Sequence, residues 1–84
     1  MSKLQKEIER LKSKPKDYTY EEIKSLLNKL GFEENNKGRT SGSGVEFEDK
    51  YARKINFHKP HPGNILKPYI IKNVLNSLKE WRLL

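Results

Sequence analysis

The stretch YTYEEIKSLLNKLGF, residues 18–32, decides how this chain begins to fold. Thr19 followed three residues later by Glu22 is the pattern of a capping box, which satisfies two backbone N–H groups at the start of a helix. Apolar residues then recur at helical spacing and form one buried stripe. Gly31 favours the left-handed conformation that ends many helices. We therefore predict a helix from Tyr20 to Leu30.

A shorter helix is expected upstream of this stretch. Its apolar residues follow the i, i+4, i+7 spacing of one helical face. They are Leu4, Ile8 and Leu11. Pro15 ends the helix, because the residue before a proline avoids the helical region of backbone space. We therefore divide the chain into an N-terminal amphipathic helix, residues 1–16, and a main domain, residues 17–84.

Three strands are predicted downstream of the capped helix. The first starts at residues 31–33. In the second, Val45 and Phe47 alternate with two glutamates, which is typical of a half-buried strand. In the third, Ile55 and Phe57 alternate with polar residues that share the solvent side of the strand. These polar residues are Lys54, Asn56 and His58.

The last predicted helix starts at Pro68, because proline suits the first turn of a helix. Its buried stripe consists of Ile70, Ile71, Val74, Leu75, Leu78 and Trp81. The element order is then helix, helix, three strands, helix. This order fits an α+β fold in which helices cover one face of a three-stranded antiparallel sheet and leave the other face open.

The charge of the chain is strongly basic and unevenly distributed. The 84 residues carry a net charge of +7. Residues 1–16 hold six cations and two anions, residues 17–49 four cations and eight anions, and residues 50–84 eight cations and one anion. A basic end beside an acidic middle favours a polyanion that docks from one side. The composition therefore favours nucleic acid as a partner over a merely solvated lysine-rich surface.

The composition also excludes several kinds of site. Without cysteine, the chain has neither disulfides nor thiolate metal ligands. No histidine–carboxylate set has metal-site spacing, so we expect no metal and no cofactor. No apolar run reaches the roughly 18 residues that a membrane span needs. The first residues lack the apolar core of a signal peptide, and we expect a cytoplasmic protein.

Both histidines of the chain lie in the segment HKPHPGN, residues 58–64, between the third strand and the last helix. Histidine is the side chain whose ordinary pKa lies near neutrality, so a pair beside cations suits proton transfer on a polyanion. His58 is the better candidate for a base, because it should point outward from the third strand beside Lys54. His61 lies between two prolines, which hold its place rigidly.

Three marks in the main domain point to one family. The first is the capped helix followed by Gly31-Phe32-Glu33, and the second is the Gly42-Ser43 turn that feeds the strand at residues 45–47. The third is the segment 58–64, which runs into Leu66-Lys67-Pro68 and the last helix. Together they resemble the HicA (YcfA-like) toxin family of bacterial toxin–antitoxin systems. The resemblance implies a double-stranded-RNA-binding-domain-like fold with an α-β-β-β-α core.

The resemblance also implies an endoribonuclease that cleaves messenger RNA without a metal, and a HicB-like antitoxin that binds and neutralises it. In the family, the residue after the Gly-Ser turn is often the catalytic histidine, and here that residue is Gly44. Three explanations remain open. His58 or His61 carries the proton transfer, the chain binds RNA without cutting it, or Gly44 was introduced to silence a toxic protein.

Phosphate contacts are expected from cations and serines near the predicted site, since such groups position nucleic-acid backbones. The candidates are Lys37, Arg39, Ser41, Ser43, Lys54, Lys59 and Lys67. No stacking platform for single-stranded bases is expected, because the aromatic residues fall on core-like periods or beside caps. A third class of function is a protein-interaction domain, in which an acidic partner such as an antitoxin covers a basic sheet face.

Overall fold

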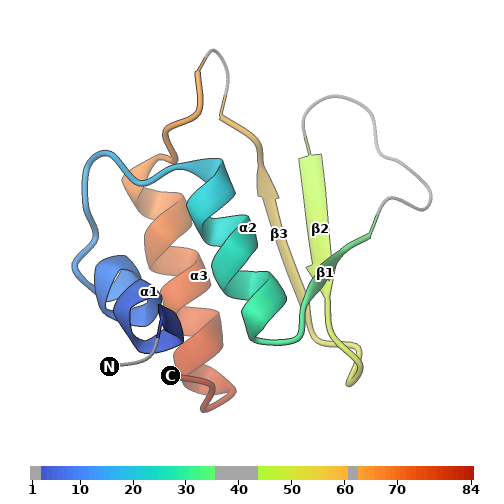
Figure 1. The fold of residues 1–84 in the computed structure, drawn as a ribbon. Coiled ribbons are helices and arrows are strands. Elements are labelled where there is room, and N and C mark those ends of the chain that lie inside the picture. The colour runs from blue at the N-terminus through green and yellow to red at the C-terminus, as the bar shows by residue number, and fades with distance from the viewer. Residues whose placement is uncertain (1–2, 36–43, 61–62) are drawn as a thin grey trace.

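The computed structural model describes residues 3–35, 44–60 and 63–84 (Figure 1). The order of its elements confirms the predicted α+β fold, with an α-β-β-β-α core and an additional N-terminal helix. The elements are α1 (Lys3–Lys12), α2 (Tyr20–Lys29), β1 (Glu33–Glu34), β2 (Gly44–Glu48), β3 (Lys54–His58) and α3 (Pro68–Glu80).

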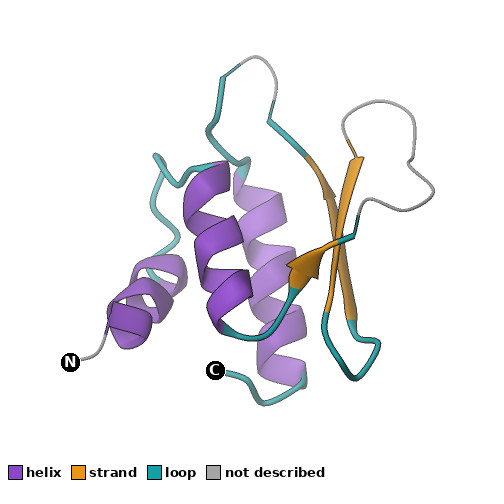
Figure 2. Cartoon of the chain, turned by 45° about the vertical axis from the view of Figure 1, so that its right-hand side comes forward, coloured by secondary structure: helices purple, strands orange, loops and turns teal. Residues whose placement is uncertain are grey.

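The elements form three layers (Figure 1, Figure 2). The strands make an antiparallel sheet in the order β1-β2-β3. Helices α2 and α3 lie side by side against one face of the sheet, with α2 contacting β1 and α3 contacting β3. Helix α1 packs on both of them from the side away from the strands. Among the described residues no helix covers the opposite face of the sheet, which leaves that face open as the sequence predicts.

Both ends of α2 are closed as predicted. At the start, the Thr19 hydroxyl accepts a hydrogen bond from the Glu22 backbone N–H at 3.2 Å, and the Glu22 carboxylate accepts one from the Thr19 N–H at 3.0 Å. At the end, Gly31 has a φ of 101°. The Phe32 N–H then donates to the Leu27 carbonyl at 2.8 Å, which is the bond of a Schellman ending. These two caps direct the chain from helix α2 into strand β1.

The hydrophobic core lies between the helix pair and the sheet. The predicted stripe of α3 is buried at Ile70, Ile71, Val74, Leu75 and Leu78. Trp81 lies just beyond the helix, where its ring stacks on Phe32 with centroids 5.9 Å apart. Burying a large aliphatic or aromatic side chain contributes about 1.5–3 kcal/mol to folding. These buried residues therefore hold α3 in the core, in contact with β3 and with α1.

Helix α1 is attached to this core by apolar and charged contacts. Ile8 and Leu11 are buried, which confirms the predicted apolar stripe. The Arg10 guanidinium forms an ion pair with the Glu22 carboxylate of the capping box. The start of α2 is thus tied both to its own backbone and to α1. The boundary between residues 16 and 17 stays a prediction.

Strands β2 and β3 confirm the predicted alternation. Phe47, Ile55 and Phe57 are buried toward the helices. The exposed side chains of β3 are Lys54, Asn56 and His58. Directly opposed residues of an antiparallel pair point to the same face, so the pattern of β3 also assigns the faces of β2.

Asp49 holds the turn that joins these strands. Its carboxylate accepts hydrogen bonds from the backbone N–H groups of Tyr51 at 3.0 Å and Arg53 at 2.9 Å, and from the Arg53 guanidinium at 2.7 Å. Burial opposes ionisation of this carboxyl, but the bonds from Arg53 and Tyr51 outweigh burial and lower the pKa of Asp49 below its ordinary value. The turn therefore contains a charged carboxylate whose bonding sets where β3 begins.

Removing the capping hydroxyl of Thr19 should destabilise the domain. Thr19→Ala should lower the free energy of unfolding by about 1 kcal/mol, because the first turn of α2 loses its side-chain acceptor. Urea denaturation followed by circular dichroism measures the change. Thr19→Ser keeps the oxygen and should stay close to the parent chain, so equal losses in the two variants would contradict the capping role.

Acid should weaken the contact between α1 and α2. The hydrogen bond from Arg10 is the main cause that holds the pKa of Glu22 below its ordinary value of 4.5, while partial burial opposes it. A lowered folded-state pKa adds stability above the ordinary pKa, and that stability is lost as the pH falls through the folded value. The free energy of unfolding should therefore drop between about pH 5 and about pH 3.

The matched variant for this test is Glu22→Gln, which cannot ionise at position 22. Urea titrations across the same pH range should show a smaller drop for this variant than for the parent. Identical pH profiles for the two proteins would show that Glu22 does not contribute to the acid sensitivity.

Candidate functional site

The pairing of β2 with β3 places His58 beside the position where the resemblance expects a histidine. Gly44 and His58 are direct partners across the two strands. Opposed positions of an antiparallel pair share one face, and their Cβ atoms normally lie about 4.5–5.5 Å apart. Gly44 offers no side chain to this face, whereas the imidazole of His58 is exposed on it. The pair thus presents an imidazole within one cross-strand spacing of position 44.

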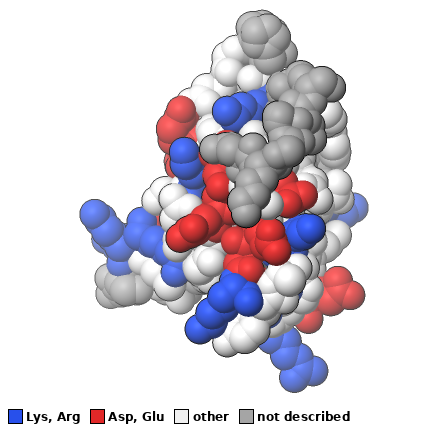
Figure 3. Space-filling view, turned by 90° about the vertical axis from the view of Figure 1, so that its right-hand side faces the viewer, with Lys and Arg blue, Asp and Glu red and all other residues white. Residues whose placement is uncertain are grey.

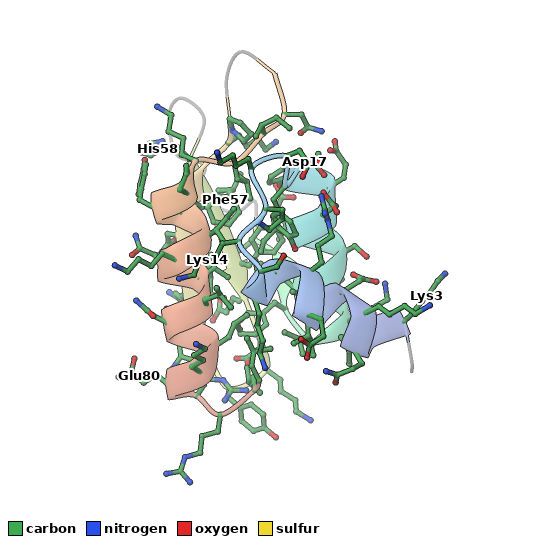
Figure 4. All side chains as sticks on the ribbon, turned by 90° about the vertical axis from the view of Figure 1, so that its left-hand side faces the viewer. Lys3, Lys14, Asp17, Phe57, His58 and Glu80 are labelled. Carbon is green, nitrogen blue, oxygen red and sulfur yellow. The ribbon has the colours of Figure 1, made fainter. Side chains whose placement is uncertain are left out.

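A groove of about 250 Å³ runs between β3 and α3 next to His58. Its lining is partly apolar, through Ile55, Phe57, Ile70 and Val74. Its polar lining comes from both elements and consists of Lys54, Asn56, His58, Tyr69, Asn73 and Ser77. Figure 4 shows His58 near the N-terminal end of α3. All five residues of β3 line the groove, so its strand side is the outer edge of β3, and Lys54 and His58 are exposed on the open face at that edge. The helix side consists of Tyr69, Asn73 and Ser77 together with the apolar residues of α3.

This set of groups suits a flexible polyanion. An ammonium group neutralises a phosphate, while amide and hydroxyl groups position the backbone through hydrogen bonds. An imidazole at the edge of the same groove can take or give a proton at a reacting oxygen. The apolar part of the lining can hold a planar ring. The groove thus combines binding groups and a proton-transfer group on two rigid elements.

The rest of the open sheet face is acidic, and Figure 3 shows carboxylates gathered over it. Glu33 and Glu48 are partners in register, and Glu46 lies on the same face of β2. The Asn35 amide donates to Glu46 at 3.0 Å and to Glu48 at 3.2 Å, which holds these two carboxylates together. The expectation of a basic sheet face is therefore wrong for the described residues. A polyanion is repelled from β1 and β2 and favoured at Lys54 on β3.

The described phosphate candidates differ in their distance from this groove. Lys54 lines it. Lys59 follows β3 with its ammonium 5.2 Å from the centre of the Tyr20 ring. Lys67 is exposed at the N-cap of α3. Lys59 directly follows β3 and Lys67 directly precedes α3, and neither lines the groove. The other predicted site residues lie outside the described residues and stay predictions: Lys37, Arg39, Ser41, Ser43 and His61.

Sequence reasoning missed the contribution of α3 to the site. Tyr69 lies beside the helix start, as expected, but it is 57% exposed and lines the groove. Asn73 and Ser77 follow it at spacings of four residues, which keeps all three on adjoining parts of one helix face. The helical spacing could have shown this contribution, because these three residues share one face of the helix and do not belong to the buried stripe.

Among the described residues there is neither a metal-binding cluster nor a helix that could span a membrane. Within residues 3–35, 44–60 and 63–84, no three His, Cys, Asp or Glu side chains come together as metal ligands would. None of the helices in these segments combines the length and the apolar character of a membrane span.

Comparison with protein families gives one match to the whole of this core. The family described as HicA toxin of bacterial toxin-antitoxin matches residues 20–80. The matched range begins with α2 and ends with α3, so it includes the sheet and the groove and leaves α1 outside. Neither the curated proteins nor the solved structures give a significant match.

Neutralising the carboxylates of β2 should favour polyanion binding at the neighbouring groove. Combining Glu46→Gln with Glu48→Gln should tighten binding of a single-stranded oligoribonucleotide by up to about tenfold at low salt, because two repulsive charges are removed. Fluorescence anisotropy measures this, and the gain should shrink as added salt screens the charges. Glu9→Gln on α1 is the matched control and should change little. Weaker binding by the β2 variant would contradict the charge argument.

Proposed function

Since this chain belongs to the HicA toxin family of bacterial toxin–antitoxin systems, we propose that it is an endoribonuclease that cleaves messenger RNA without a metal. The excess of cations in residues 50–84 supports an RNA substrate. We further propose the cytoplasm as its location and a HicB-like antitoxin as its partner. The antitoxin would neutralise the toxin by covering the groove between β3 and α3.

The pairing of Gly44 with His58 carries the proposal. The resemblance assigns the catalytic histidine to the position that Gly44 occupies. Because the two positions face the same side of the sheet, an imidazole at His58 reaches nearly the same place as one at position 44. His58 therefore supplies in this chain the imidazole that Gly44 lacks. His61, from the same connection to α3, is the second candidate for proton transfer.

The reaction needs one proton to be removed from the attacking oxygen and another to be given to the leaving oxygen. His58 takes the proton of a ribose 2′-hydroxyl, and the resulting oxygen attacks the adjacent phosphorus. The bond from phosphorus to the 5′-oxygen of the next nucleotide breaks, and that oxygen takes a proton from a second acid, a role that suits His61. Negative charge builds up on the phosphoryl oxygens as the 2′-oxygen attacks, so a cation such as the ammonium of Lys54 stabilises the transition state more than the bound substrate.

The phosphates on either side of the cleaved bond need further cations. Lys59 and Lys67 are exposed next to the ends of β3 and α3 and suit this role. The proposal includes four more residues, which precede β2 in the chain: Lys37, Arg39, Ser41 and Ser43. Phosphate contacts of this kind position RNA but carry little sequence preference.

RNA binding should depend steeply on salt. If Lys54, Lys59 and Lys67 each neutralise a phosphate, the logarithm of the association constant should fall against the logarithm of salt concentration with a slope of about −2 or steeper. Fluorescence anisotropy titrations at several salt concentrations measure the slope. Lys54→Gln should make it shallower by about 0.7. Binding that is absent or independent of salt would contradict an RNA-binding role.

Removing the imidazole of His58 should stop cleavage and leave binding in place. His58→Gln should slow cleavage of a labelled RNA by about 10²- to 10⁴-fold, because the base is lost while the cations remain. Induction of the same variant in bacterial cells should no longer arrest growth. His61→Gln, measured in parallel, tests the second proton-transfer role.

The outcomes separate the open explanations. Unchanged cleavage by His58→Gln would contradict its role as the base. RNA binding by the parent chain without cleavage or growth arrest would favour the second candidate function, a non-catalytic RNA-binding module, which the missing side chain at Gly44 supports.

A further inference from the structure

We propose that Tyr69 stacks on a base of the bound RNA and thereby positions the attached ribose beside His58. This inference rests on the proposed function and adds to it a residue that selects single-stranded RNA. It concerns α3, whereas the proposed chemistry concerns β2 and β3.

Tyr69 presents an open aromatic face. Its side chain is 57% exposed. Each of the other three tyrosines has a cation over its ring, within the roughly 6 Å at which such contacts are favourable. These pairs are Arg10 with Tyr18 at 5.6 Å, Lys59 with Tyr20 at 5.2 Å, and Arg53 with Tyr51 at 4.9 Å. Among the described residues no cation covers Tyr69 in this way, so its ring is available to another planar group.

The groove next to Tyr69 offers partners to the edge of a base. Asn73 and Ser77 lie one and two turns further along α3, and Asn56 lies on β3. Their amide and hydroxyl groups can both donate and accept hydrogen bonds, which matches the mixed edges of nucleobases. A base held by stacking is sequence-tolerant, and these side chains can then add preference.

The same placement brings the ribose toward the catalytic imidazole. The two sides of the groove divide the RNA, with Tyr69 on α3 for the base and the exposed edge of β3 for the sugar–phosphate backbone, which reaches Lys54 at the other end of the strand. The ribose joins base to phosphate and therefore lies between the two elements. His58 is the last residue of β3 and lies near the N-terminal end of α3, where Tyr69 is, so its imidazole is close to the path of the 2′-hydroxyl.

Stacking on Tyr69 requires an unpaired base. In an A-form duplex the faces of the bases are stacked on one another, and proteins meet mainly the backbone and the 2′-hydroxyls. The carboxylates of Glu46 and Glu48 on the neighbouring strand also oppose the broad phosphate surface of a duplex. Tyr69 therefore gives a preference for single strands to a domain whose fold resembles that of duplex-binding proteins.

The test compares Tyr69→Ala with a matched exposed tyrosine. Tyr51 is 66% exposed but lies in the β2–β3 turn and does not line the groove. Tyr69→Ala should weaken binding of a single-stranded oligoribonucleotide by roughly 5- to 150-fold, and Tyr69→Phe should bind like the parent because it keeps the ring. Tyr51→Ala should change affinity little. An oligomer of the same length with abasic sites should bind the parent and Tyr69→Ala equally.

The results distinguish this inference from the proposed function. If the parent binds no RNA, the proposed function fails and this inference fails with it. If the parent binds RNA but Tyr69→Ala binds as tightly as Tyr51→Ala, only the stacking role is overturned. An equal loss on the abasic oligomer would also overturn it, since the ring would then act without a base. Circular dichroism of each variant establishes that the fold is retained.

Discussion

The register of the hairpin formed by β2 and β3 is the constraint on which the rest of the structure depends. A slip by one residue would turn every side chain of a strand to the opposite face. In the observed register Phe47 pairs with Ile55 inside the core, while Gly44 pairs with His58 on the open face. The carboxylate of Asp49 holds the turn through backbone and guanidinium bonds. One buried carboxylate therefore helps to set both the core and the position of the imidazole.

The groove follows from the way α3 packs on this hairpin. The buried stripe of α3 draws the helix onto the sheet, and the polar residues beside that stripe then line a hollow along β3. The cation that attracts a polyanion and a carboxylate that repels it lie on neighbouring strands, because Lys54 on β3 is paired with Glu48 on β2. This division of charge favours a polyanion at the groove rather than across the sheet.

Local patterns predicted most of the fold, but not the contacts between elements. The caps at Thr19 and Gly31 depend on neighbouring residues alone, and the structure has both. The alternation of β3 likewise predicted which of its side chains are exposed. The partnership of Gly44 with His58 was not predictable, because register depends on how many residues the Asp49 turn takes up. The net charge of the chain also led to a wrong expectation, a basic sheet face. The acidic middle of the chain supplies two of the three strands, β1 and β2.

The most direct test of the account moves the imidazole across the strand pair. RNA cleavage is measured for His58→Gly alone and for His58→Gly combined with Gly44→His, with circular dichroism to establish an intact fold. The account predicts that the single variant loses about 10²- to 10⁴-fold in rate and that the double variant recovers much of it. Recovery follows because opposed positions share one face of the sheet. An active single variant, or a double variant as inactive as the single one, would contradict the account.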